Sequence, residues 1–167
     1  FDLPGQVELF NMHDALRAVV AAITGPEWNL RLCTVHLIDS HLCADPTKYI
    51  AALMLSLSSM LHLETPHVNV LSQVHLMDKY GELDFNLEYY ADVMNLEYLA
   101  DRILDGNQDV IAAAPSPGQT MMRKRYGKLT KGLCELVEDF GLVNFTTLSI
   151  EDKTSVERVV QLTDKSI

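Results

Sequence analysis

The sequence predicts an α/β domain in which a parallel sheet is flanked by helices. Three runs of nearly continuous apolar character, residues 30–39, 67–72 and 142–149, are rich in β-branched residues and typical of strands buried on both faces. Segments with helical spacing precede, separate and follow these runs. Such alternation is typical of βαβ units, whose right-handed crossovers place helices on both faces of one sheet.

Breakers and caps bound the expected helices. The first, over residues 8–23, stops before the Gly25-Pro26 pair, and the second begins with Asp45 as N-cap and Pro46 at the first helical position. The second helix runs to about residue 62 with an apolar side made of Ile50, Leu53, Met54, Leu57 and Leu61. Further helices are expected over 85–104, 119–140 and 154–162, with a loop over 112–118.

Composition bounds the class of protein. The chain has 167 residues, of which 48% are hydrophobic and 22% charged, as in an ordinary globular domain. Its formal charge of −10, from 13 Lys and Arg against 23 Asp and Glu, argues against direct binding of nucleic acid. Three cysteines are too few for a disulfide framework and favour a reducing compartment. No apolar run is long enough for us to expect a membrane span.

The first residues have the pattern of a strand end that runs into a turn. A strand that starts at its own last residue, Phe1, indicates that a preceding part is missing. We therefore expect residues 1–167 to be a single, partial domain from the later part of a longer protein. A processed chain that starts at Phe1 is the alternative.

The turn Asp2-Leu3-Pro4-Gly5-Gln6 is the first candidate site, because ligands of open parallel sheets bind at the carboxyl ends of strands. This pattern has a chemical meaning in nucleotide triphosphatases. The Asp holds the hydration shell of Mg²⁺, the Gly amide approaches a γ-phosphate, and the Gln orients an attacking water. The alternative is a strand-to-helix turn that uses Pro-Gly for its geometry alone.

Two further strand ends add candidate residues. They follow the expected strands over 67–72 and 142–149. A guanine-nucleotide-binding protein of this topology carries its base-reading loops in this order and at about these intervals along the chain. The candidate nucleotide-binding residues are Ser72, Gln73, His75, Leu148 and Ser149.

Longer motifs make a resemblance specific. They are DLPGQVELF at 2–10, HLIDSH at 36–41, DPTKYI at 45–50, YGELDFNLEYY at 80–90, LVNF at 142–145 and IEDK at 150–153. With them the chain closely resembles the GPN-loop GTPases over nearly its whole length, apart from residues 112–125. It is most similar to the second paralogue of that family.

The resemblance implies a P-loop NTPase-type fold and a dimeric GTPase that binds GTP or GDP with Mg²⁺. It implies that Asp2 contacts Mg²⁺ through water, that Asp2 and Gln6 serve catalysis, and that Gly5 approaches the γ-phosphate. It also implies a family paralogue or a second copy as dimer partner, and a role in assembly and nuclear import of RNA polymerase II. The implied location is the cytoplasm, with shuttling to the nucleus.

The sequence departs from the family pattern in two places. The P-loop, Gly-x-x-x-x-Gly-Lys-Ser/Thr, does not occur in residues 1–167, nor does the Gly-Pro-Asn tripeptide, so the predicted sheet is incomplete and lacks the P-loop strand. Because a missing central strand uncovers backbone and apolar faces, we expect residues 1–167 alone not to form a stable monomer. The base-reading motif Ser/Thr/Asn-Lys-x-Asp is replaced by Ser72-Gln73-Val74-His75.

The second departure puts guanine specificity in question. An Asp accepts two hydrogen bonds from guanine, each worth roughly 1.5–3 kcal/mol, whereas a neutral His75 offers one acceptor at most. The alternative function is therefore a nucleotide-dead homologue that acts as a binding or scaffold module. A receiver-like domain is disfavoured because its acidic pocket and Lys are not found. A metal site at His36, His41 and Cys43 is disfavoured because His36 and Asp39 point to opposite faces of their strand.

Overall fold

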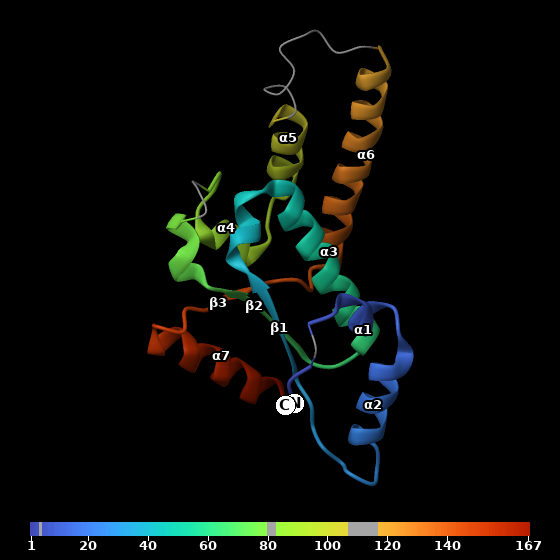
Figure 1. The fold of residues 1–167 in the computed structure, drawn as a ribbon, viewed down its shortest axis with the longest axis vertical. Coiled ribbons are helices and arrows are strands. Elements are labelled where there is room, and N and C mark those ends of the chain that lie inside the picture. Colours follow the sequence, from blue (N-terminus) through green and yellow to red (C-terminus); the bar gives the residue numbers. More distant parts are fainter. Residues whose placement is uncertain (4, 80–82, 107–116) are drawn as a thin grey trace.

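The computed structural model describes residues 1–3, 5–79, 83–106 and 117–167. A parallel three-stranded sheet, in the order β1-β2-β3, lies at the centre of this part of the chain (Figure 1). The predicted α/β class, with a parallel sheet flanked by helices, is confirmed. The elements in chain order are α1 (Val7–Asn11), α2 (Asp14–Thr24), β1 (Thr34–Asp39), η1 (Ser40–Ala44), α3 (Pro46–Leu63), β2 (His67–Ser72), η2 (Val74–Lys79), α4 (Leu87–Asp92), α5 (Glu97–Gly106), α6 (Pro117–Phe140), β3 (Thr146–Thr147) and α7 (Lys153–Ser166).

Helices cover both faces of the sheet, as right-handed crossovers predict (Figure 1). On one face, Ile38 of β1 and Leu71 of β2 belong to a core shared with α3, α5 and α6. Successive residues of a strand point to opposite faces, so Val70 lies on the other face, where α7 packs against β2. Val70 and Leu71 are both fully buried, which makes β2 the central strand.

α3 begins at the predicted cap. The side chain of Asp45 accepts hydrogen bonds from the amides of Thr47 at 2.9 Å and Lys48 at 3.4 Å. Pro46 occupies the first helical position, where its missing N–H costs nothing.

The apolar side predicted for α3 is confirmed over most of the helix. Ile50, Leu53 and Leu57 are buried in the core. Leu61 was predicted on the same side but is 49% exposed, because Met60 and Leu63 face the core at this end of the helix.

The single helix predicted over residues 8–23 is wrong, since the chain forms α1 and α2 with an interruption at Met12 and His13. Asn11 Oδ1 accepts a hydrogen bond from Ser59 Oγ at 3.1 Å, and the carbonyl of His13 lies 3.4 Å from His62 Nε2. These contacts anchor the interruption to α3, against which both short helices pack. Periodicity does not encode such a tertiary anchor.

The single helix predicted over residues 85–104 is also wrong, because it divides into α4 and α5. Val93 and Asn95 adopt left-handed backbone angles, with φ of 52° and 59°. Burial of Val93 and Leu96 stabilises the break. The Leu96 amide also donates a 2.5 Å hydrogen bond to the carboxylate of Glu138 on α6.

Two strands are shorter than predicted. β1 starts at Thr34, whose amide donates to the carbonyl of Pro66 at 2.8 Å. Because Pro66 has no N–H, the ladder cannot continue in that direction. β3 spans only Thr146–Thr147, and the amide of the preceding Phe145 donates to Ala91 outside the sheet at 2.8 Å.

The last two helices agree with the sequence in position. α6 starts at Pro117, so Pro117 and Gly118 belong to the helix and not to the predicted loop. The remainder of that loop, residues 112–116, lies outside the described residues, as do Pro4 of the first motif and residues 80–82. α7 begins after Asp152, whose side chain caps it. Within the ranges that the structure describes, no helix combines the length and the hydropathy needed to cross a bilayer.

β1 is an edge strand among the described strands and pairs with β2 alone. Its Val35 and Leu37 side chains are 40% and 59% exposed. Phe1, predicted to end a strand, lies in no strand here and is 96% exposed. An open edge with exposed apolar side chains agrees with the incomplete sheet that the sequence predicts.

Candidate functional site

The carboxyl ends of the three parallel strands meet at one edge of the sheet. β1 ends at Asp39 and β2 at Ser72, which lie opposite each other in the ladder. After β3, the amide of Leu148 still donates to the carbonyl of Leu71 at 2.8 Å, so Ser149 follows at the same edge. Open parallel sheets bind their ligands at this edge.

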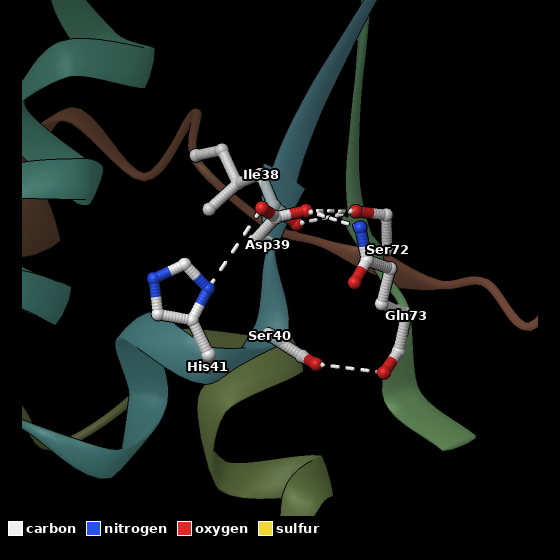
Figure 2. A network of polar contacts seen from close by, with 6 residues as sticks. All are labelled: Ile38, Asp39, Ser40, His41, Ser72 and Gln73. Carbon is white, nitrogen blue, oxygen red and sulfur yellow. Dashed lines mark hydrogen bonds and ion pairs between the residues drawn. The ribbon is translucent and has the colours of Figure 1, made fainter. Parts of the chain in front are cut away.

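Asp39 is the centre of a polar network at this edge, shown in Figure 2. Its Oδ1 accepts hydrogen bonds from Ser72 Oγ at 2.9 Å and from Gln73 Nε2 at 3.1 Å. Its Oδ2 lies 3.8 Å from Nδ1 of His41. The end of β1 therefore positions the loop that follows β2.

Gln73 has a left-handed backbone, with φ of 59°, which few side chains other than Asn and Asp adopt. Its carbonyl accepts hydrogen bonds from Ser40 Oγ at 3.1 Å and from the amide of Leu76 at 2.9 Å. Ser40 is buried, so water does not compete strongly for its hydroxyl. Together with Asp39, these contacts hold both the backbone and the side-chain amide of Gln73.

His75 joins the loop after β2 to the loop after β3. Its Nδ1 lies 3.3 Å from Ser149 Oγ, and the neighbouring Val74 amide donates to the carbonyl of Leu148 at 3.4 Å. Ser149 is fixed in turn, because its amide donates to Ser155 Oγ at 3.1 Å and that hydroxyl donates to the Ser149 carbonyl at 2.8 Å. With Nδ1 engaged by Ser149, a neutral His75 has one ring nitrogen left, as either a donor or an acceptor.

The structure does not bring Asp2, Gly5 and Gln6 to this edge. Gln6 is the N-cap of α1, which packs against α3 near the amino ends of the strands (Figure 1). All three residues are exposed. No described strand runs into Asp2, so no ladder holds the turn at the carboxyl edge, and the roles of these residues stay predictions.

Sequence reasoning missed Asp39 and Ser40 as members of the site. Both lie in the 36–41 motif directly at a strand end, which was the available signal. His36 takes no part, since it points to the face of the sheet opposite Asp39, where its ring lies beside that of His67 with 6.0 Å between ring centroids. In the part of the chain that the structure covers, no three His, Cys, Asp or Glu side chains gather to hold a metal.

Comparison with known proteins assigns the family. A family model described as a conserved hypothetical ATP binding protein matches residues 1–167. GPN-loop GTPase QQT1 of Arabidopsis thaliana is 51% identical over 166 residues, which are 99% of this chain and 51% of that protein. This chain belongs to the GPN-loop GTPase family. The parallel sheet with helices on both faces agrees with the P-loop NTPase-type fold predicted for such a protein.

Two other relatives identify the branch of the GPN-loop GTPases. GPN-loop GTPase 2 of Xenopus tropicalis is 44% identical over 165 residues, 99% of this chain and 49% of the relative. GPN-loop GTPase 2 of Saccharomyces cerevisiae is 40% identical over 166 residues, 99% and 44% of the respective chains. Their names confirm the predicted similarity to the second paralogue. The chain spans about half the length of the curated relatives it matches.

Proposed function

We propose that the full-length protein binds GTP or GDP with Mg²⁺ at the carboxyl edge of the sheet and hydrolyses GTP. The observation that carries this proposal is the joining of the loops after β2 and β3 at the edge where parallel sheets bind ligands, in a chain of the GPN-loop GTPase family. The base would contact Ser72, Gln73, His75, Leu148 and Ser149.

In this proposal, Asp2, Gly5 and Gln6 would form the phosphate side of the site in the full-length protein. The exposed Asp2 carboxylate is an oxygen donor of the kind that Mg²⁺ takes, here through bound water. Mg²⁺, when bound, neutralises charge on the phosphates. Gly5 leaves room for the γ-phosphate, and Gln6 orients the attacking water. In this proposal a strand before Asp2 pairs near the open edge of β1 and carries the turn to the carboxyl edge, and the P-loop comes from a segment outside residues 1–167.

Nucleotide binding and hydrolysis by the full-length protein test this proposal. We expect a fluorescent GTP analogue to bind, and Mg²⁺ to strengthen the binding. Gln6→Leu should keep the affinity and slow hydrolysis about tenfold or more, because the water loses its orienting group. Gln161→Leu, at an exposed position of α7, is the matched control. Absence of binding for every guanine and adenine nucleotide, with and without Mg²⁺, would overturn the proposal.

A second candidate function is a nucleotide-independent binding or scaffold module. Two contacts favour it, because Gln73 donates to Asp39 and His75 contacts Ser149 where the family motif has Lys and Asp. In this case the network only stiffens the edge of the sheet. Partner binding would then have the same affinity with and without nucleotide, which equilibrium binding to a purified partner measures.

We also propose a cellular role from the family resemblance alone. The dimer partner would be a GPN-loop paralogue or a second copy, and the protein would take part in assembly and nuclear import of RNA polymerase II from the cytoplasm, with shuttling to the nucleus. Depletion in cells should leave polymerase subunits in the cytoplasm. Normal nuclear polymerase after depletion would contradict this role.

A further inference from the structure

Three polar side chains gather on one face of the sheet, toward the amino ends of β1 and β2. His36 and Asn69 lie opposite each other in the β1–β2 ladder, and His67 lies two residues before Asn69 on β2. Two residues further along the ladder, Ile38 and Leu71 belong to the hydrophobic core together with side chains of α3. Because every second residue of a strand points to the same face, all of these side chains share the face that α3 covers. His36, His67 and Asn69 are here called the inner polar cluster.

The inner polar cluster holds buried polar atoms that lack partners. Nδ1 of His36, both ring nitrogens of His67 and Oδ1 of Asn69 are buried and have no hydrogen-bond partner among the described residues. Asn69 is 3% exposed, and its amide nitrogen donates to Met60 Sδ at 3.4 Å, so the amide oxygen stays free. Buried polar groups are normally hydrogen-bonded, and a group of unpartnered ones therefore indicates a water or an ion among them.

The two imidazoles are close enough to share one metal ion. Their ring centroids lie 6.0 Å apart, with the rings at 78° to each other. An imidazole nitrogen binds zinc at about 2.0–2.1 Å, which places the ion about 3.2 Å from the ring centroid. Two rings on one ion can therefore be at most about 6.4 Å apart, and about 5.2 Å apart in a tetrahedral site. His36 and His67 lie within the upper limit and reach the tetrahedral value by approaching each other by less than about 1 Å.

The protonation state of the rings suits a metal ion. Burial lowers the pKa of His36, partly offset by the neighbouring Asn69 side chain. Burial, together with His36, lowers the pKa of His67 to about 4. Both imidazoles are therefore neutral at physiological pH, so a metal ion has no proton to displace. Both side chains are half-buried, so an ion can reach them from solvent.

The donor set selects the class of ion. Imidazole nitrogens favour Zn²⁺ and related transition metals, whereas Mg²⁺ prefers oxygen ligands. The third donor is the amide oxygen of Asn69 and not a further His, Cys, Asp or Glu side chain. Three protein ligands and one water complete a tetrahedral zinc site.

We propose that His36, His67 and Asn69 bind one Zn²⁺ ion, with water in the fourth position. The site is separate from the proposed nucleotide site, because three residues of β1, about 10 Å of strand, lie between His36 and Asp39. The inference therefore does not rest on nucleotide binding.

Calorimetric titration of Zn²⁺ into chelator-treated full-length protein tests the site. Excess Mg²⁺ is present throughout, so that it competes at sites made of oxygen ligands. We expect one ion per chain, with a dissociation constant on the order of micromolar or below. His36→Gln and His67→Gln should each weaken binding about tenfold or more, because each removes a ligand. His13→Gln, at an exposed histidine before α2, is the matched control and should bind like wild type.

Asn69→Asp distinguishes a metal site from a cluster that only packs. A carboxylate binds Zn²⁺ more strongly than an amide oxygen does, so this variant should bind Zn²⁺ about tenfold more tightly. Without metal, its buried charge should lower the melting temperature, and Zn²⁺ should restore it. A destabilised Asn69→Asp protein that Zn²⁺ does not restore would contradict the proposal.

The wild-type protein provides a test that needs no variant. Zn²⁺ should raise its melting temperature, and a chelator should reverse the rise. No saturable binding by wild type up to about 100 µM Zn²⁺ would overturn the site, and buried water would then satisfy the cluster. Circular dichroism establishes that the histidine variants are folded. Equal binding by wild type and both folded variants, or equal loss in His13→Gln, would show adventitious binding elsewhere and would also overturn the site.

Discussion

Asp39→Ala should loosen the carboxyl edge of the sheet. The carboxylate is the common acceptor for Ser72 Oγ and Gln73 Nε2, at 2.9 and 3.1 Å. Without it, Ser72 keeps the Ile38 carbonyl at 3.2 Å as an acceptor. Gln73 loses its side-chain anchor and retains a left-handed backbone that is unfavourable for its residue type. The loop that carries His75 should therefore become mobile.

The size of the effect follows from the contacts. A hydrogen bond to a charged group is worth roughly 1.5–3 kcal/mol, and the partial exposure of Asp39 reduces each of the two to about 1 kcal/mol. The ion pair with His41, at 3.8 Å between half-exposed groups, adds less than about 0.5 kcal/mol. The expected loss is about 2 kcal/mol in the free energy of unfolding. If the loop after β2 must be ordered for nucleotide to bind, a loss of about 2 kcal/mol lowers the nucleotide affinity by up to about 30-fold.

Urea unfolding of full-length wild type, Asp39→Ala and Asp39→Asn measures this loss. Asn keeps an oxygen acceptor for Ser72 and Gln73, so Asp39→Asn should lose less than half as much as Asp39→Ala. Hydrogen exchange should become faster in the loop after β2 in the Ala variant. A change below about 0.5 kcal/mol in Asp39→Ala, the usual range for a surface substitution, would refute the reasoning.

Three further predictions follow from other parts of the chain. Gln73→Lys/His75→Asp supplies two acceptors for guanine and should raise the ratio of GTP affinity to ATP affinity about tenfold or more. Competition binding measures this ratio. An unchanged ratio would mean that the base binds elsewhere. Burial, with the neighbouring His36, lowers the pKa of His67 to about 4. Below pH 6.5 the unfolded chain therefore binds a proton at His67 that the folded chain does not bind until about pH 4. The free energy of unfolding should decrease by about 1–2 kcal/mol as the pH falls through that window, and less steeply in His67→Asn. The same pH dependence in both proteins would contradict this. Residues 1–167 expressed alone should aggregate or melt without cooperativity, because the β1 edge is open, and a sharp calorimetric transition of a monomer would refute that.

Local signals in the sequence predict the elements that local chemistry controls. α3 begins at Pro46 because this proline and the Asp45 cap act within one turn. β2 keeps its predicted bounds and is buried on both faces. The break at Met12 and His13 depends on Ser59 of α3, and the break at Val93–Leu96 depends on Glu138 of α6. Tertiary contacts of this kind leave no periodic trace in the sequence.

The candidate site divides in the same way. Ser72, Gln73 and Ser149 lie at strand ends, so parallel topology alone brings them to one edge. Asp39 also ends a strand, but its role comes from its contacts with Ser72 and Gln73 across the β1–β2 ladder. A strand pattern in the sequence does not specify such cross-strand contacts. The position of Asp2 depends on a strand partner that the described residues do not supply.

Hydrogen exchange of the full-length protein, with and without a Mg²⁺-bound non-hydrolysable GTP analogue, tests the central claim most directly. We predict that nucleotide protects the amides of residues 72–75 and 148–149 at the carboxyl edge of the sheet, and that Asp39→Ala diminishes this protection. Binding without protection at these two loops would contradict the site, and absence of binding would contradict the function.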